Sequence, residues 1–166
     1  GIRGILVGHC DMFQRPMSTP PTHPLLEELS FRGLLHQTTN LEGLGEALAS
    51  GPQRVYAGFD PTADSLTVGN LVPIMVLKHL QRAGHHPVVL MGGGTGLIGD
   101  PSGKSQERLL LDEATIGANV TGQSRIFENI LSFEGPNAAQ LVNNLDWLKE
   151  LGFIQVLRDV GKHFSV

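Results

Sequence analysis

The chain has 166 residues, 40% of them apolar, and a mean hydropathy of +0.01, which fits one α/β domain with a hydrophobic core and excludes a membrane protein. A formal net charge of −4 and the lack of any lysine or arginine cluster argue that these residues form no nucleic-acid surface by themselves. The single cysteine, Cys10, cannot form an internal disulfide, so we expect a reducing, cytoplasmic location.

The first residues differ in composition from the rest. The chain begins with Gly rather than Met, and its apolar run at 4–8 is too short for a signal peptide. A proline-rich stretch, 16–24, follows. We therefore expect residues 1–24 to be a tail or linker without fixed structure, with Met17 as an alternative translation start.

Two short helices are predicted next. In the first, at 24–35, leucines recur on one face, and Thr22 is expected to cap it. The second covers 41–50 and ends at Gly51-Pro52, because proline lacks the donor that a helix needs and glycine allows the chain to turn.

A strand, a helix and a second strand follow. The apolar runs 54–59 and 88–91 predict buried strands, and the pattern at 71–83 predicts a helix with Asn70 as its N-cap. This order predicts a βαβ unit, in which both strands end at the same edge of a parallel sheet. The expected fold class is α/β, with a Rossmann-like parallel sheet and flanking helices. In such folds ligands bind at that edge.

The rest of the chain is predicted to be mostly helical. A long helical pattern covers 113–133, weakened by Gly117 and Gly122, and a second helix is expected over 138–151, where leucines recur at spacings of four and three. A further element begins near residue 153.

The glycine run after the second strand imitates two nucleotide-binding motifs. Residues 94–99 match the dinucleotide fingerprint, and 99–105 resemble a P-loop that lacks one residue between its glycines. Both interpretations are disfavoured: Pro101 and Gly103 are incompatible with the helix that should open there, and Asn119 falls where the fingerprint expects an acid. Glycines that only let a helix pack on a strand remain an alternative.

Charged side chains cluster near the predicted ligand edge. Asp60 and Asp100 each follow a strand, and carboxylates there suit an ammonium group or ribose hydroxyls. A turn-forming role is the alternative for either one, but two at one edge favour function. Lys104 and Arg108 could neutralise a phosphate chain, although a solvated charged surface is the simpler interpretation.

No other catalytic signature is found in the sequence. The histidines lack the spacing typical of metal ligands, and no Gly-x-Ser-x-Gly motif is present. We expect neither a metal site nor a protein nucleophile.

Four blocks of sequence are long and unusual: YAGFDPTADSL at 56–66, QRAGH at 81–85, GGGTGLIGDPSGK at 92–104 and LRDVGKHFSV at 157–166. Through them, residues 25–166 resemble the bacterial-type tyrosyl-tRNA synthetases, which are class I aminoacyl-tRNA synthetases. The resemblance implies that tyrosine attacks the α-phosphorus of ATP to give tyrosyl-adenylate, and that tyrosine is then transferred to tRNA(Tyr). ATP with Mg²⁺ would be a substrate, no cofactor would be tightly bound, and the full-length protein would be a cytoplasmic homodimer.

The resemblance also implies residue roles. Tyr56 would contact the phenol hydroxyl of tyrosine and Leu90 its ring, while Thr95 and Asp100 would lie at its amino group. The ATP and adenylate would be bound by Gly58, Asp60, Gly69 and Asn70. Catalysis would come from positioning and charge stabilisation by Thr62, Thr67, Asn70, Lys104 and Arg108.

Two departures from the family pattern stand out. The signature His-Ile-Gly-His is replaced by Thr67-Val68-Gly69-Asn70. Asn70 can still donate to a ribose, but Thr67 loses a ring donor to phosphate, a loss of about 3 kcal/mol of transition-state stabilisation unless the Thr67 hydroxyl or Thr62 compensates.

The second departure is length, because the family's later strands, its Lys-Met-Ser-Lys-Ser loop and its anticodon-binding domains would lie beyond Val166. We therefore expect residues 25–166 to form the N-terminal half of a Rossmann-like catalytic domain that is inactive by itself. The alternative is a catalytically inactive, synthetase-like nucleotide-binding module; a dinucleotide-dependent oxidoreductase is a more distant one.

Overall fold

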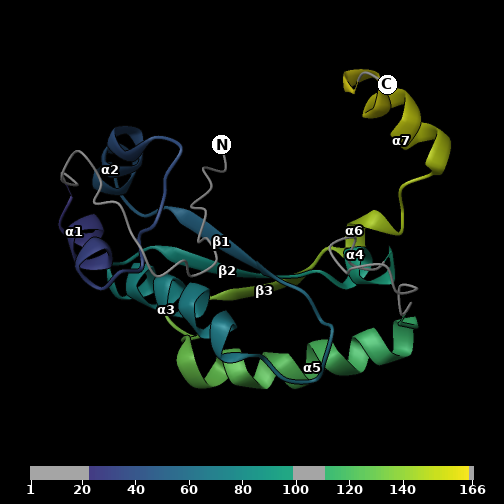
Figure 1. Ribbon diagram of the computed structural model, residues 1–166, viewed down its shortest axis with the longest axis horizontal. Coiled ribbons are helices and arrows are strands. Elements are labelled where there is room, and N and C mark those ends of the chain that lie inside the picture. The colour runs from purple at the N-terminus through teal and green to yellow at the C-terminus, as the bar shows by residue number, and fades with distance from the viewer. Residues whose placement is uncertain (1–22, 99–110, 165–166) are drawn as a thin grey trace.

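The computed structural model describes residues 23–98 and 111–164, which are coloured in Figure 1. Its centre is a three-stranded parallel sheet in the order β1-β2-β3. The strands are β1 (Arg54–Phe59), β2 (His86–Met91) and β3 (Gln140–Asn143). The predicted fold class, a parallel α/β sheet flanked by helices, is confirmed, and the first strand has the predicted bounds.

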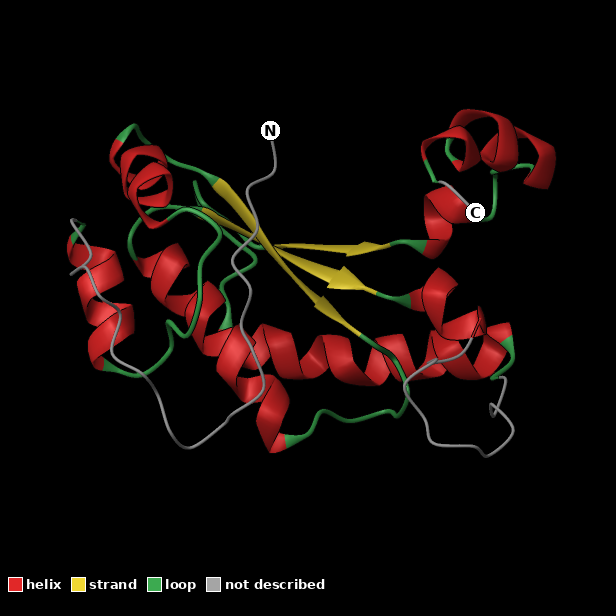
Figure 2. Cartoon of the chain, turned by 45° about the horizontal axis from the view of Figure 1, so that its top comes forward, coloured by secondary structure: helices red, strands yellow, loops and turns green. Residues whose placement is uncertain are grey.

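Two helices, α3 (Val68–Arg82) and α5 (Glu113–Ile130), lie on the same face of the sheet (Figure 2). Side chains alternate along the strands, so Val55, Phe59, Val89 and Met91 are buried on that face. The ring of Phe59 packs against Phe127 of α5 with centroids 4.8 Å apart. Apolar burial between sheet and helices therefore fixes this layer.

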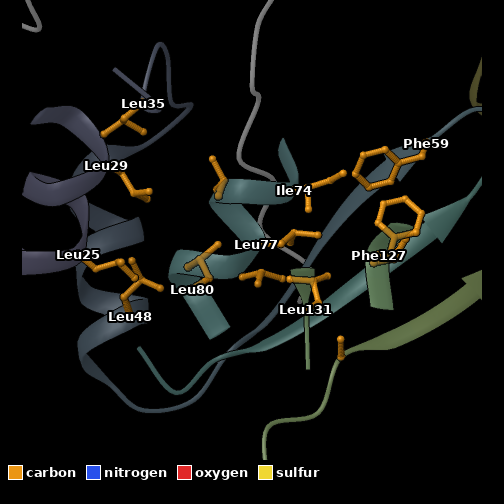
Figure 3. Close-up of a cluster of buried hydrophobic side chains, with 14 of the residues drawn as sticks. Leu25, Leu29, Leu35, Leu48, Phe59, Ile74, Leu77, Leu80, Phe127 and Leu131 are labelled. Carbon is orange, nitrogen blue, oxygen red and sulfur yellow. The ribbon is translucent and has the colours of Figure 1, made fainter. Parts of the chain in front are cut away.

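Two shorter helices, α1 (Pro24–Phe31) and α2 (Leu41–Ala49), extend the core near the amino ends of the strands. Figure 3 shows their leucines beside those of α3. The N-cap of α1 is His23, whose Nδ1 accepts a 3.2 Å hydrogen bond from the backbone N–H of Leu25. The predicted cap, Thr22, lies outside the described residues.

The start of α3 differs from the prediction. The helix begins at Val68 with Thr67 as its N-cap, so Asn70 is the third helical residue rather than the cap. The Asn70 side chain turns back instead, and its Oδ1 accepts a 2.9 Å hydrogen bond from the backbone N–H of Thr67. A side chain that reaches back to the cap residue satisfies a donor that the first turn leaves free.

The predicted helix over 138–151 is wrong. Residues 140–143 form β3, which pairs in parallel with β2, and only the short α6 (Leu145–Leu148) is helical. The leucine spacing fits a helix, but pairing with a neighbouring strand satisfies the backbone and buries Leu141 partly against the core. Tertiary pairing overrides the local pattern here.

Smaller differences occur elsewhere. The glycine run expected to be a loop contains the short helix α4 (Gly93–Ile98). Helix α5 ends at Ile130, three residues before the predicted end at Phe133, because Leu131 is already extended, with φ −93° and ψ 155°.

The C-terminal described residues form α7 (Phe153–Asp159) and the 3-10 helix η1 (Gly161–His163). Figure 1 shows α7 standing away from the sheet. Its apolar side chains are exposed, with Phe153 at 75% and Ile154 at 74%. Within 23–98 and 111–164, no helix has the length and apolar character needed to cross a membrane.

Candidate functional site

The first two strands bring Asp60 and Thr95 to one point at the carboxyl edge of the sheet. The backbone N–H of Gly92, directly after β2, donates a 2.8 Å hydrogen bond to the carbonyl oxygen of Phe59 at the end of β1. A methyl group added to Gly92 would lie 2.8 Å from both Asp60 Oδ1 and Thr95 Oγ1. The carboxylate and the hydroxyl therefore lie on either side of the Gly92 position, and a larger residue there would displace both. An ammonium group is a suitable ligand for such a pair.

The sheet face opposite α3 and α5 carries Tyr56, Gly58 and Leu90. In the parallel register Tyr56 pairs with Val88 and Gly58 with Leu90, so these side chains point to the same face. Tyr56 is 46% exposed and Leu90 is half-buried. A methyl group on Gly58 would meet no atom within 4 Å. The face therefore has room for a ligand beside the phenol of Tyr56.

At the start of α3, the predicted catalytic residues Thr67 and Asn70 bind each other. The hydroxyl of Thr67 donates a 2.8 Å hydrogen bond to Asn70 Oδ1, which also accepts the Thr67 backbone N–H. Thr67 and Gly69 are exposed, and Asn70 is half-buried. The amide Nδ2 of Asn70 is therefore the donor that remains for a ligand.

Thr62 lies on the loop 60–64, which joins β1 to the approach of α3. Two side chains of α5 bind this loop: Asn119 Nδ2 donates to the carbonyl oxygen of Pro61 at 2.9 Å, and Gln123 Nε2 to that of Ala63 at 2.8 Å. The sequence analysis missed both amides. Their signal is a pair of polar residues four apart on the helix face that also carries the buried Ile116 and Phe127.

The first amides of α4 are already occupied. The backbone N–H of Gly93 donates to Asn143 Oδ1 at 3.1 Å, and that of Gly94 to Asn144 Oδ1 at 2.7 Å. Contrary to expectation, a helix does open in the glycine run, but the N–H groups of its first two residues are already bound and not free for a phosphate. The geometry thus adds a second reason against the dinucleotide and P-loop interpretations.

Asn144 also orients Thr95. Its Nδ2 donates a 3.2 Å hydrogen bond to Thr95 Oγ1, and that hydroxyl donates to the carbonyl oxygen of Gly92 at 3.2 Å. Sequence analysis missed Asn143 and Asn144 because it placed them inside a helix. Asn143 ends β3 and Asn144 directly follows it, so both are in the position at the ligand edge where side chains of this fold contact a site.

The remaining predicted residues Asp100, Lys104 and Arg108 lie outside the described residues, so their predicted roles stay predictions. Elsewhere in 23–98 and 111–164, no group of three or more His, Cys, Asp or Glu side chains is arranged to hold a metal ion. Two hollows open at the amino end of the sheet, one of about 460 Å³ lined by α2 and the start of β1, and neither includes a predicted site residue.

Comparison with known proteins identifies the family. Residues 48–166 match the family model of the class I tRNA synthetases for tryptophan and tyrosine (W and Y). The chain belongs to this family. It is 52% identical over 152 residues to the tyrosine–tRNA ligase of Rhodopirellula baltica and 53% identical over 149 residues to that of Rhodospirillum rubrum. These matches cover 92% and 89% of the chain but 35% and 36% of the relatives, so the chain spans about a third of their length.

Solved synthetase structures share the fold. A C-terminally truncated mitochondrial tyrosyl-tRNA synthetase of Aspergillus nidulans superposes with a TM-score of 0.72 at 28% identity, covering 85% of this chain and 43% of that one. The corresponding Coccidioides posadasii protein gives a TM-score of 0.68 at 29% identity, covering 86% and 41%. The three-stranded sheet and its helices are therefore part of a class I synthetase catalytic domain.

Proposed function

We propose that this chain serves in a tyrosine–tRNA ligase, which activates tyrosine with ATP to tyrosyl-adenylate and transfers it to tRNA(Tyr). The observation that carries the proposal is the convergence of Asp60 and Thr95 above Gly92, next to the open face that bears Tyr56. Tyrosine–tRNA ligases are also the relatives at about half identity. Residues 25–166 would form the N-terminal half of the catalytic domain.

In this proposal tyrosine lies on the open sheet face. Its phenol hydroxyl would contact Tyr56 and its ring Leu90, while its ammonium group would lie at Thr95 and Asp100. A bound substrate would cover the exposed Tyr56, and phenylalanine would then leave the Tyr56 hydroxyl buried without a partner. This favours tyrosine over phenylalanine, an effect that the tyrosyl-tRNA synthetases themselves exemplify.

ATP, bound with Mg²⁺ as substrate, would lie along the carboxyl edge. Gly58 and Asp60 would flank the adenylate and its ribose, and Gly69 and Asn70 the nucleoside. The pyrophosphate would leave past Thr62, with Lys104 and Arg108 stabilising its charge. The Thr67 hydroxyl would join them by turning its proton from Asn70 Oδ1 to the phosphate. The chemistry needs no protein nucleophile, because the tyrosine carboxylate attacks phosphorus directly. A cytoplasmic homodimer is the assembly that we propose for the full-length protein.

The test is tyrosine-dependent exchange of pyrophosphate into ATP by the full-length gene product, with Thr67→His measured in parallel. We expect exchange with the natural Thr67 and a rise of up to roughly 10²-fold on restoring the histidine donor. The 166-residue chain by itself is expected to show none. Omission of tyrosine, and its replacement by phenylalanine, are the controls.

The second candidate is a synthetase-like module that binds nucleotide without catalysis. The observation that favours it is the Thr67–Asn70 pair, which uses the Thr67 hydroxyl proton inside the protein. Exchange that is absent in the natural protein and present only in Thr67→His would support this module and overturn the ligase.

A further inference from the structure

We propose that Asn119, Gly122 and Gln123 of α5 are positioning residues that hold the loop 60–64 in the geometry needed for ATP. This inference rests on the proposed function, since it assigns to the loop the nucleotide side of the site. The three residues touch the backbone at four of the loop's five positions, namely Asp60, Pro61, Ala63 and Asp64. The loop carries the Asp60 carboxylate and the Thr62 hydroxyl, both of which are exposed.

Asn119 binds the first turn of the loop. It is buried, and its Nδ2 donates a 2.9 Å hydrogen bond to the carbonyl oxygen of Pro61. The Pro61 ring itself is fully buried. The residue between Asp60 and Thr62 is therefore fixed both by packing and by a hydrogen bond.

Gly122 sets the distance between α5 and the far end of the loop. A methyl group at this position would overlap the backbone carbonyl of Asp64. Because the overlapping group is backbone, any larger residue must push the loop and the helix apart. Gly117, five residues earlier on the same helix, has nothing within 4 Å of an added methyl.

Gln123 spans the loop. Its side chain is 1% exposed, and Nε2 donates to the carbonyl oxygens of Ala63 at 2.8 Å and Asp60 at 3.4 Å. Its Oε1 is buried without a hydrogen-bond partner among the described residues. A buried acceptor without a partner is unfavourable, so packing alone does not explain a glutamine here. The two N–H bonds to the loop do.

The loop has few other restraints. Its side chains at Thr62, Ala63 and Asp64 are exposed, and the described residues supply hydrogen bonds to its carbonyls only from α5. Catalysis by positioning tolerates little movement, because a displacement of about 1 Å can cost on the order of 10²-fold in rate. The α5 contacts therefore fix Asp60 and Thr62 before ATP binds.

A glutamine elsewhere in the chain provides a matched control. Gln81 of α3 is 6% exposed, and its Nε2 donates to the carbonyl oxygens of Ser132 at 2.7 Å and Asn137 at 3.2 Å. It holds a loop in the same way, but at the amino end of the sheet. Gln81→Met and Gln123→Met therefore remove similar hydrogen bonds at the two opposite ends.

The experiment measures pyrophosphate exchange and thermal unfolding of the full-length protein for four variants. We expect Gln123→Met and Gly122→Ala to lower kcat/KM for ATP by roughly 10- to 100-fold. The KM for tyrosine should change little, since Tyr56, Leu90 and Thr95 lie on other elements. Gln81→Met and Gly117→Ala should keep the ATP parameters of the parent, even though Gln81→Met lowers the unfolding temperature at least as much as Gln123→Met, because the Gln81 Oε1 also accepts from the N–H of Ser132.

The results distinguish a failure of the positioning role from a failure of the proposed function. Equal ATP parameters in Gln123→Met and Gln81→Met would overturn the positioning role, as would parallel losses for ATP and tyrosine in Gln123→Met. A parent protein without any exchange would instead remove the proposed function, and this inference with it. If Gly122→Ala does not fold, the comparison of Gln123→Met with Gln81→Met tests the positioning role.

Discussion

At each end of the sheet a buried glutamine side chain holds a neighbouring segment by hydrogen bonds to its backbone, but the two glutamines serve different purposes. At the amino end, Gln81 holds the turn 132–137 by hydrogen bonds to backbone, and leucines of α1 and α2 belong to the buried core. At the carboxyl end, Gln123 holds the loop 60–64, but every side chain of the loop except Pro61 stays exposed, as does Tyr56 on the open sheet face. A buried amide thus stabilises the fold at one end and shapes a site at the other.

The largest expected effect comes from the leucine core at the amino end. Leu80 is 1% exposed and packs between α1 and the sheet, so Leu80→Ala should lower the free energy of unfolding by about 2–5 kcal/mol. Chemical denaturation measures the loss. Protein that remains folded should keep the KM for ATP of the parent, and a specific rise in that KM would show that the two ends are not independent.

A smaller effect is expected at the cap of α2. Asn40 Oδ1 accepts a 2.8 Å hydrogen bond from the backbone N–H of Gly43, so Asn40→Ala should cost about 1 kcal/mol of unfolding free energy. Asn40→Asp retains the acceptor and is the matched control. Equal losses in the two variants would mean that the cap hydrogen bond is not the cause.

The smallest expected effect is a pH dependence at the amino end. Burial lowers the pKa of His85, and the nearby His23 and His86 lower it further. Its Nδ1 accepts a 3.1 Å hydrogen bond from the backbone N–H of Gln53, which requires an unprotonated nitrogen. Because the unfolded chain binds the proton more readily, this contribution to stability is complete above the ordinary histidine pKa and decreases as the pH falls below about 6.5.

His85→Asn offers an acceptor that does not titrate. Denaturation midpoints of parent and variant, measured between about pH 8 and pH 5, should diverge at the acidic end, where the parent loses more stability. Parallel curves would exclude His85 as the titrating group.

Local patterns predicted much of the framework. The alternating strand 54–59, the second strand and the helix between them gave the parallel α/β fold and the edge where Asp60 lies, because strand and helix periods are local properties of the sequence. The helix expected at 138–151 failed for a physical reason. The preference of 140–143 for a strand comes from pairing with β2, a partner some fifty residues earlier in the chain.

The sequence by itself determined the family, the first two strands of the sheet and the positions of Tyr56, Asp60 and Thr95 on or after them, since these depend on motif and period. Only the tertiary structure decided how those groups are held. Asn119 and Gln123 reach the loop 60–64 across about sixty residues of chain, and Asn143 and Asn144 reach the start of α4 across fifty. A hydrogen bond between distant residues cannot be recognised from the periodicity of the sequence, because each partner alone looks like an ordinary polar residue.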